Sequence, residues 1–257
     1  MSYNKFMTKY DTRRLLSFVR QACQHYNMIS DDDRIAVGVS GGKDSLALLI
    51  TLAHMRRFYP KKYSLVAVTI DMGFEGMDFS CVSELCRELD VEYITVKSEI
   101  AHVIFDIRKE SNPCALCAKM RRGVLHDTAK ANGCNKVALG HHFDDVTDTF
   151  LLNLIHEGRL GTFSPVTYLS RKDLTVIRPL IYAKEKDIRY FISHNDIPTV
   201  VSTCPEDKHT EREEVKKMIA DLDKKYDGFS HRLMNAIEKA HLDGFSPCKR
   251  ERRTKNE

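Results

Sequence analysis

The sequence predicts an α/β protein: a parallel sheet with helices on both faces, extended by helices at both ends. Two observations support this fold class. Short apolar runs alternate with segments of helical periodicity along the chain. The composition, with 42% hydrophobic and 30% charged residues in 257, is that of a globular domain with additions.

Five apolar runs predict buried strands, because each is short and rich in residues that favour strands. The first, RIAVGVS, ends at a pair of glycines, and the fourth, KVALGHH, also contains a glycine near its end. The predicted strands cover residues 34–40, 63–71, 92–97, 136–142 and 174–180.

Helices are predicted between these strands. After the first strand, Leu46, Leu49, Ile50 and Ala53 follow the i, i+3, i+4, i+7 spacing of one helix face. Further helical patterns cover residues 77–90, 117–132 and 148–158, and helical additions cover 10–29 and 184–242.

This organisation predicts four regions. They are an N-terminal helical extension (1–33), a catalytic domain (34–182), a C-terminal helical region (183–245) and a basic tail (246–257). The sequence shows no signal-peptide core and no apolar run of the roughly 20 residues that a membrane span needs, so we expect a cytoplasmic protein without membrane contact. The net charge of +4 is weak evidence for a nucleic-acid partner.

The sequence SGGKDS, residues 40–45, predicts a phosphate-binding loop. Its small residues let backbone N–H groups approach an anion, and the helix that follows adds a partial positive charge. Lys43 could neutralise an oxyanion, and Asp44 could help to hold Mg²⁺. The alternative is a strand–helix turn in which Ser40 and Asp44 only cap the helix. The loop fits neither the Walker A motif nor the dinucleotide motif.

The eight cysteines are many for a reducing compartment, where a disulfide framework is not expected. Cys114 and Cys117 form a C-x-x-C pair, and Cys204 lies in a loop before a proline. From the residues alone, the three thiols could bind an iron–sulfur cluster or zinc, or take part in redox chemistry or packing.

The loop resembles the signature of the PP-loop ATP pyrophosphatases. PCALCAKMRRG, ALGHHFDDVTDTFLLNLIHEGRLGT and VIRPLIYAKEKDI are similar to consecutive blocks of the TtcA/TtuA family, and the likeness covers about residues 34–225. The termini lack zinc-finger cysteine pairs, which favours the TtcA branch of 2-thiocytidine-forming tRNA enzymes. The resemblance implies a Rossmann-like fold of the adenine nucleotide alpha hydrolase type.

In that family the C-x-x-C pair and one later cysteine bind a [4Fe-4S] cluster. The resemblance therefore implies Cys114, Cys117 and Cys204 as its ligands. It also implies that Gly140 approaches ATP and that Asp145 lies near ATP and Mg²⁺. We expect the nucleotide to contact Val39, Ser40, Gly41, Gly42, Lys43, Asp44, Ser45, Ile70, Asp71, Gly140 and Asp145.

For several candidate residues, an ordinary structural role is an alternative to a role in binding or catalysis. Asp71 ends the second strand and could contact the ribose or Mg²⁺. Arg121 and Arg122 could face the adenylate or the tRNA backbone, or lie on an ordinary helix surface. His141 and His142 could touch phosphate or simply make internal hydrogen bonds.

The resulting hypothesis is a tRNA sulfurtransferase that adenylates the C2 oxygen of a pyrimidine, with cytidine 32 of the anticodon loop as the expected position. Lys43, Asp44, Asp145 and Arg121 are the expected catalytic residues. The expected partners are tRNA, a sulfur donor (sulfide or a cysteine desulfurase) and a second copy in a homodimer. The alternatives are thiolation of another tRNA base, a lysidine-type amine ligase, and a non-enzymatic iron–sulfur RNA-binding sensor.

Overall fold

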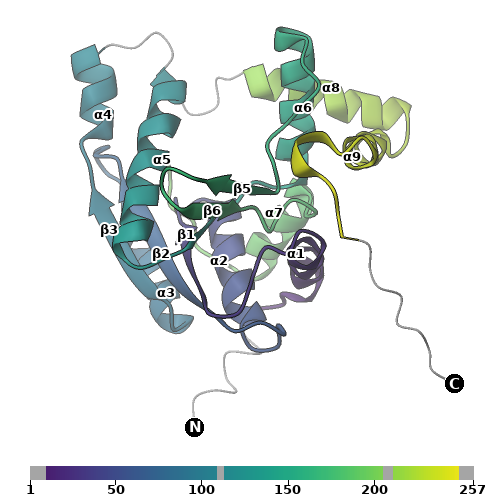
Figure 1. Ribbon diagram of the computed structural model, residues 1–257. Helices are drawn as coiled ribbons and strands as arrows, with labels where there is room; N and C mark the ends of the chain where they lie inside the picture. The colour runs from purple at the N-terminus through teal and green to yellow at the C-terminus, as the bar shows by residue number, and fades with distance from the viewer. Residues whose placement is uncertain (1–9, 109–112, 205–210, 249–257) are drawn as a thin grey trace, which may run out of the picture.

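Six strands form one twisted sheet in the order β3-β2-β1-β4-β6-β5 (Figure 1). The computed structural model describes residues 10–108, 113–204 and 211–248. All neighbouring strands are parallel except β5 and β6, which are antiparallel. The strands are β1 (Asp33–Gly38), β2 (Tyr63–Asp71), β3 (Glu92–Lys97), β4 (Lys136–Ala138), β5 (Val166–Leu169) and β6 (Leu174–Ile177).

The helices alternate with these strands, as predicted. Those before and between the first four strands are α1 (Arg13–His25), α2 (Lys43–Met55), α3 (Ser80–Glu88), α4 (Ile100–His102), the π-helix η1 (Val103–Arg108) and α5 (Pro113–Ala131). The later ones are α6 (Phe143–Glu157), α7 (Glu185–His194), α8 (Glu211–Lys225), α9 (Phe229–Lys239) and the 3₁₀ turn η2 (Leu242–Gly244).

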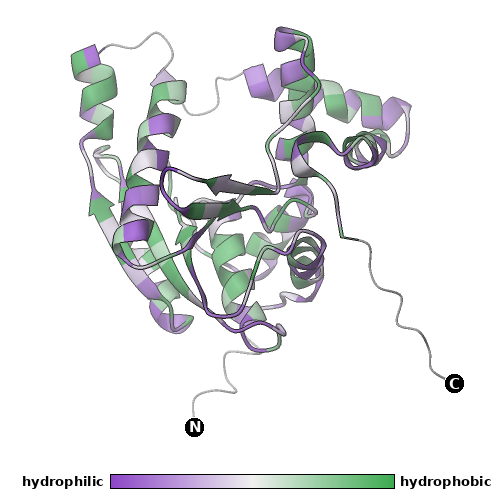
Figure 2. Cartoon of the chain, in the orientation of Figure 1, coloured by the Kyte–Doolittle hydropathy of each residue, from purple (hydrophilic) through white to green (hydrophobic). Residues whose placement is uncertain are grey.

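Each face of the sheet has its own core. On one face α5 packs against β1, β2 and β4, burying Leu125 and Ala129 against Val66 and Val137. On the other face α2 lies against β1 and is covered in turn by α1 and α7. Helix α2 is buried along its length from Ser45 to Met55 because it lies between the sheet and this outer layer, and Figure 2 shows it coloured mostly as hydrophobic.

The fold class is confirmed, and most element boundaries differ from prediction by a few residues; three differences bear on the site. The predicted strand 136–142 ends at Ala138, because the chain turns away toward α6. The predicted helix 148–158 begins five residues earlier, at Phe143, because His142 and Asp145 form a capping box. The fifth predicted strand is the second half of a hairpin, β5–β6, whose short turn makes the pair antiparallel.

The predicted terminal additions contain helices α1 before the sheet and α7, α8 and α9 after it. Residues 1–9 of the predicted extension and 249–257 of the predicted tail lie outside the described residues. The division into four regions stays a prediction. No helix in the described ranges is long and apolar enough to span a membrane.

Candidate active site

The 40–45 loop joins β1 to α2 and is held by its own side chains. The Ser45 hydroxyl donates a hydrogen bond to the Gly42 carbonyl (2.9 Å), and the Ser40 amide donates to Ser45 Oγ (3.2 Å). Gly41 has φ +81°, which favours glycine, and a Cβ there would lie 2.3 Å from Val200 Cγ2. The loop therefore has a fixed shape at the N-terminus of α2, where anions are favoured.

Gly140 brings a second strand end against this loop. A Cβ at Gly140 would lie 3.2 Å from the carbonyl carbon of Asp44 and 3.3 Å from the amide nitrogen of Ser45. The absence of a side chain thus lets the segment after β4 pass directly over the first turn of α2. As a result, Asp44 on α2 and Asp145 on α6 both reach the same cavity.

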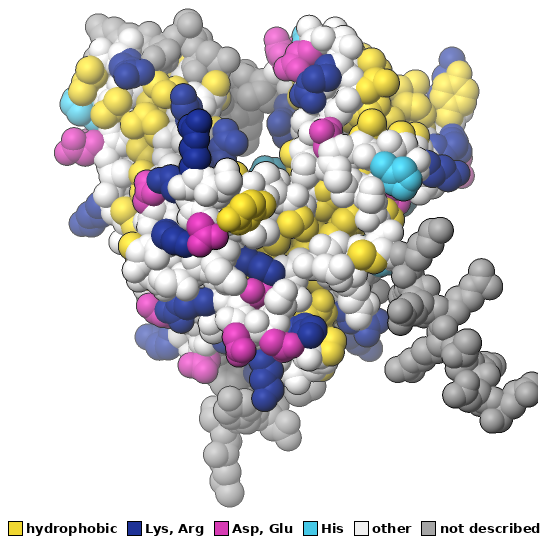
Figure 3. Space-filling model, viewed as in Figure 1, with side chains coloured by type: hydrophobic (Ala, Val, Ile, Leu, Met, Phe, Trp, Pro, Cys, Tyr) yellow, Lys and Arg dark blue, Asp and Glu magenta, His cyan; other side chains and the backbone are white. Residues whose placement is uncertain are grey.

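A cavity of about 620 Å³ lies above the carboxyl ends of β1, β2, β4 and β6, which is the usual ligand position in such sheets. In Figure 3 the surface is hollowed between the part built by α4 and α5 and the part built by α6 and α8, with Lys and Arg side chains on both sides. Of the predicted site residues, those that line it are Val39, Ser40, Gly42, Asp44, Ser45, Ile70, Arg121, Gly140 and Asp145.

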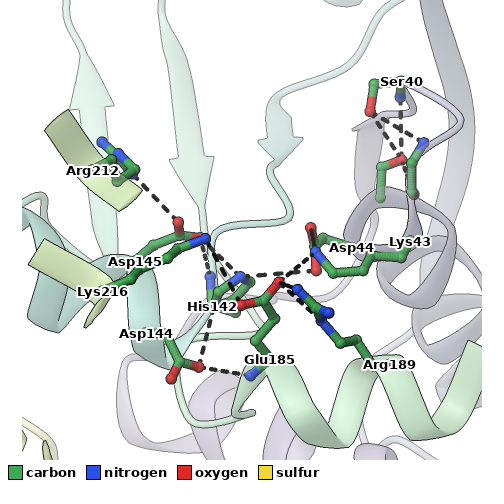
Figure 4. Close-up of polar contacts among 12 residues, drawn as sticks. Ser40, Lys43, Asp44, His142, Asp144, Asp145, Glu185, Arg189, Arg212 and Lys216 are labelled. Carbon is green, nitrogen blue, oxygen red and sulfur yellow. Dashed lines mark hydrogen bonds and ion pairs between the residues drawn. The ribbon is translucent and has the colours of Figure 1, made fainter. Parts of the chain in front are cut away.

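Lys43 does not line this cavity. Its ammonium pairs with Asp44 Oδ2 (2.9 Å) and Glu185 Oε1 (3.1 Å), as Figure 4 shows. Glu185, in the first turn of α7, also pairs with Arg189 (2.8 Å) and lies 3.8 Å from Lys216 of α8. The charges of Arg189, Lys43 and Lys216 outweigh the effect of burial and hold the pKa of Glu185 at about 2. The loop is thereby joined to α7 and α8.

His142 lies at the centre of three carboxylates. Its ring nitrogens are 3.5 Å from Asp145 Oδ2, 3.6 Å from Asp144 Oδ2 and 3.8 Å from Asp44 Oδ1 (Figure 4). Burial lowers the pKa of His142, but these carboxylates outweigh it, and the net pKa is raised. Asp144 Oδ2 also accepts a hydrogen bond from the Glu185 amide (2.6 Å), which extends the network to α7.

The pKa of the neighbouring His141 is shifted in the opposite direction to that of His142. It lines the cavity and its ring lies 4.8 Å from that of Phe163. Burial, together with the positive charge of Arg178, lowers the pKa of His141 to about 4, so this imidazole is neutral at physiological pH.

Asp44 and Asp145 have oxygen atoms suited to a hard cation. Asp44 Oδ1 is buried and makes no hydrogen bond within the described part of the chain. Asp145 Oδ2 accepts the His142 amide (3.0 Å), and Oδ1 lies 3.4 Å from Arg212. Carboxylates that flank a phosphate site are typical ligands of Mg²⁺. Asp71 lies apart from them, does not line the cavity, and accepts a hydrogen bond from the Gly73 amide (3.0 Å).

The three predicted cluster ligands come from two segments. Cys114 and Cys117 lie one turn apart at the start of α5, and Cys204 lies at the end of the loop that crosses Gly41. Burial raises the pKa of Cys117, Arg121 lowers it, and the neighbouring thiols Cys204 and Cys114 raise it further, so the three lie within electrostatic range. Within residues 10–108, 113–204 and 211–248, no three metal-ligating groups already surround a common point.

Of the three predicted cluster thiols, that of Cys117 is linked to the cavity by a contact. Its sulfur lies 3.4 Å from the sulfur of Met72, which lines the cavity, and Arg121 and Arg122, one turn further along α5, line it directly. Three soft thiol donors beside the cavity match the ligand chemistry of an iron–sulfur cluster. The donor set fits that group.

The comparisons with known proteins agree with this geometry. A family model described as a PP-loop domain matches residues 8–222. The tRNA-cytidine(32) 2-sulfurtransferase of Geobacter sulfurreducens is 37% identical over 236 residues, which cover 91% of this chain and 92% of that protein. The chain belongs to the PP-loop family and, within it, to the tRNA-cytidine(32) 2-sulfurtransferase family. The predicted family is confirmed.

Two further relatives of this PP-loop protein carry the same name. That of Syntrophotalea carbinolica is 38% identical over 213 residues, covering 82% of each chain. That of Idiomarina loihiensis is 34% identical over 239 residues, covering 92% of this chain and 80% of its own. The U34-tRNA thiolase NcsA from Methanococcus maripaludis, solved with its [4Fe-4S] cluster, has a TM-score of 0.74 at 24% identity, covering 88% and 78% of the chains. This last likeness shows the shared fold.

Several residues of the PP-loop site were not predicted as site residues. Glu185 and Arg212 belong to the C-terminal helices and reach the site only through the fold. Arg178 follows β6 directly and lines the cavity. An arginine inside the apolar run VIRPL, at the end of a predicted strand, is the sequence signal that would have found it.

Proposed function

We propose that this protein is an ATP-dependent tRNA-cytidine(32) 2-sulfurtransferase. The observation that carries the proposal is one cavity lined by residues of the 40–45 loop, by Asp145 at the start of α6 and by the arginines of the C-x-x-C helix. The 34–38% identity to proteins of that name, over most of the chain, supports the same reaction.

In the first step of the proposed reaction, the C2 oxygen of the cytosine attacks the α-phosphorus of ATP. The bond from that phosphorus to the bridging oxygen breaks, and pyrophosphate leaves. The 40–45 loop would bind the departing phosphates, and Asp44 and Asp145 would hold Mg²⁺, which would supply positive charge for the phosphates. Lys43 exchanges its contact with Glu185 for the phosphates and stabilises their charge.

In the second step, sulfur at the oxidation level of sulfide attacks C2. The bond between C2 and the adenylated oxygen breaks, AMP leaves with its oxygen, and the thiolated base remains, so no external oxidant or reductant is consumed. Arg121, which lines the cavity, would neutralise the departing AMP phosphate. The target base must leave its stack to enter the cavity, which favours a single-stranded loop.

Cys114, Cys117 and Cys204 would hold a [4Fe-4S] cluster. When bound by three thiolates, such a cluster supplies an iron without a protein ligand, at which sulfide can be carried. The chain's own contribution is to place the thiols at the cavity through the contact of Cys117 with Met72. The proposed sulfur donor is sulfide or a cysteine desulfurase, and the proposed working form is a cytoplasmic homodimer.

The test is anaerobic purification followed by iron and sulfide analysis and by nucleoside analysis of tRNA treated with ATP and sulfide. We expect about four irons per chain and ATP-dependent 2-thiocytidine. Cys204→Ala should lose both, whereas Cys248→Ala, which changes an exposed cysteine at the end of the described chain, should lose neither.

Each other outcome selects an alternative. Thiolation of a different nucleoside would correct the substrate and keep the reaction. An ATP-dependent amine adduct without iron would indicate a lysidine-type ligase. Iron without sustained pyrophosphate release in the presence of tRNA would indicate a sensor, and it would overturn the proposal.

A further inference from the structure

The β6 end of the cavity contains an arginine whose charge is not balanced. Arg178 follows Ile177 at the carboxyl end of β6, the same sheet edge that carries the phosphate loop after β1 and the histidines after β4. It lines the cavity together with His141 and Phe163. Its backbone is anchored by the hydrogen bond from its amide to the Pro165 carbonyl (3.1 Å).

The three nitrogens of its guanidinium have different environments. Nη1 donates to the Ser164 carbonyl (2.6 Å) and to Thr167 Oγ1 (3.2 Å). Nε is buried without a hydrogen-bond acceptor among the described residues. Nη2 makes no hydrogen bond to a described residue and is not among the fully buried atoms, so it remains free to donate to a ligand.

The surroundings hold this group in place without neutralising it. Its Cζ lies 5.1 Å from the centre of the Phe163 ring. Burial lowers the pKa of Arg178 to about 10, and the charge of Arg122 acts in the same direction. No described carboxylate forms an ion pair with Arg178, whereas Arg212 on the same cavity wall lies 3.4 Å from Asp145.

A partly desolvated guanidinium without a counter-ion is costly, so its retention at a cavity wall indicates a ligand that supplies the negative charge. We propose that Arg178 binds a phosphate group in the cavity through Nη2. The phosphate comes from one of two sources, the nucleotide at its α-position or the RNA backbone beside the target base. This inference rests on the proposed function, which brings both ligands to the cavity.

The test compares the full-length protein with Arg178→Gln, Arg178→Lys and the control Arg20→Gln, which changes an exposed arginine on α1. Equilibrium binding of Mg·ATP is measured without RNA, and binding of unmodified tRNA is measured over a range of salt concentrations. We expect Arg178→Gln to weaken one of the two ligands about 10- to 100-fold, the loss for one charge-assisted hydrogen bond. Arg178→Lys should be intermediate, and the control unchanged.

The two sources give different results. Weaker ATP binding without RNA assigns the site to the nucleotide phosphate. Unchanged ATP binding with weaker tRNA binding, and a salt dependence reduced by about one phosphate contact, assigns it to the RNA backbone. Both results support the inference.

Unchanged affinity for both ligands would overturn it. If the melting temperature also fell, the role of Arg178 would be to anchor the β5–β6 hairpin through Ser164 and Thr167. Failure of the proposed function is distinguishable, because a wild-type protein that binds ATP but thiolates no tRNA would still report the subsite through ATP binding.

Discussion

The two sides of the cavity differ in how their charges are balanced. On the side of the phosphate loop and α7, Lys43, Glu185 and Arg189 form a chain of ion pairs, and His142 lies among three carboxylates (Figure 4). On the side of α5 and β6, Arg121 and Arg178 form no ion pair with any described residue.

This difference separates a side that keeps its shape alone from a side that needs a ligand. Paired charges in a partly buried network hold one another in position and resist rearrangement. Unpaired arginines leave a positive wall, which is suited to phosphates of a nucleotide or RNA. The paired side therefore holds the shape of the 40–45 loop, and the unpaired side is suited to anionic ligands.

The largest expected effect comes from removing the ammonium group of Lys43. Lys43→Ala should reduce tRNA-dependent pyrophosphate release about 100- to 1000-fold, because the ammonium stabilises charge on the transferring phosphates. Lys43→Arg, which keeps the charge, serves as the matched control. Full activity in the alanine variant would show that another cation stabilises the phosphates, and it would contradict the role given to the paired side.

Asp148 is the exception on the paired side, because its carboxyl group is buried and forms no ion pair with a described residue. It is 2% exposed, and its Oδ2 makes no hydrogen bond within the described chain. Burial, with the negative charge of Asp145, raises the pKa of Asp148 from 3.8 to about 7. The stability that the neutral form contributes is complete below pH 4 and is lost as the pH rises through 7.

Asp148→Asn should therefore be more stable than the wild type at pH 8, by about 2 to 4 kcal/mol, and nearly equal to it at pH 4. Urea unfolding at both pH values measures this difference. Asp221→Asn, an exposed carboxylate on α8, should show no such dependence. An equal effect of Asp148→Asn at both pH values would contradict the raised pKa.

A substitution at Gly41 tests whether packing on Val200 fixes the shape of the 40–45 loop. Gly41→Ala places a side chain at φ +81° and a Cβ 2.3 Å from Val200 Cγ2, so the free energy of unfolding should fall by about 2 to 3 kcal/mol. Gly42→Ala is the matched control, because its φ is −77° and its nearest neighbour, Ser40 Oγ, would lie 3.6 Å away. Equal losses in the two variants, measured by urea unfolding, would show that packing on Val200 does not fix the loop.

The smallest expected effect concerns the partner of Lys43. Glu185→Gln removes a carboxylate that competes with phosphates for the ammonium, so Mg·ATP should bind about 3- to 10-fold more tightly. Glu213→Gln, on α8 and 3.3 Å from Lys216, is the control and should leave the affinity unchanged. Weaker ATP binding in Glu185→Gln would show that Glu185 positions Lys43 instead.

Much of the fold could be predicted because its signals are local. The strands 63–71 and 92–97 have the predicted bounds, since each is one apolar or alternating run. The start of α6 was predicted five residues too late, because its signal is the His142–Asp145 capping box and not hydrophobic periodicity. Strand β5 was missed because its residues, VTYL, are only partly buried at the edge of the sheet and do not form a long apolar run.

For the candidate site too, the local motifs could be predicted from the sequence, and the contacts between distant residues could not. The loop 40–45 was predicted because small residues after a strand favour close backbone approach to an anion, whereas Gly140 came from family resemblance; Gly140 and most residues of the loop line the cavity. The convergence of Cys204 with Cys114 and Cys117 came from family resemblance, and their spacing alone leaves several uses open. Glu185 was not predicted, because it reaches Lys43 only through the fold, and Arg178 was not predicted although an arginine at the end of an apolar run was a usable signal.

The sequence by itself determined the alternation of strands and helices, the phosphate loop and the family, since these depend on neighbouring residues and short motifs. Only the tertiary structure decided which charges are paired. The partners of Lys43 and Asp145 include Glu185 and Arg212, which lie far along the chain. Arg178 receives no such partner, because β6 ends at the cavity wall beside Phe163, where no described acid reaches its guanidinium.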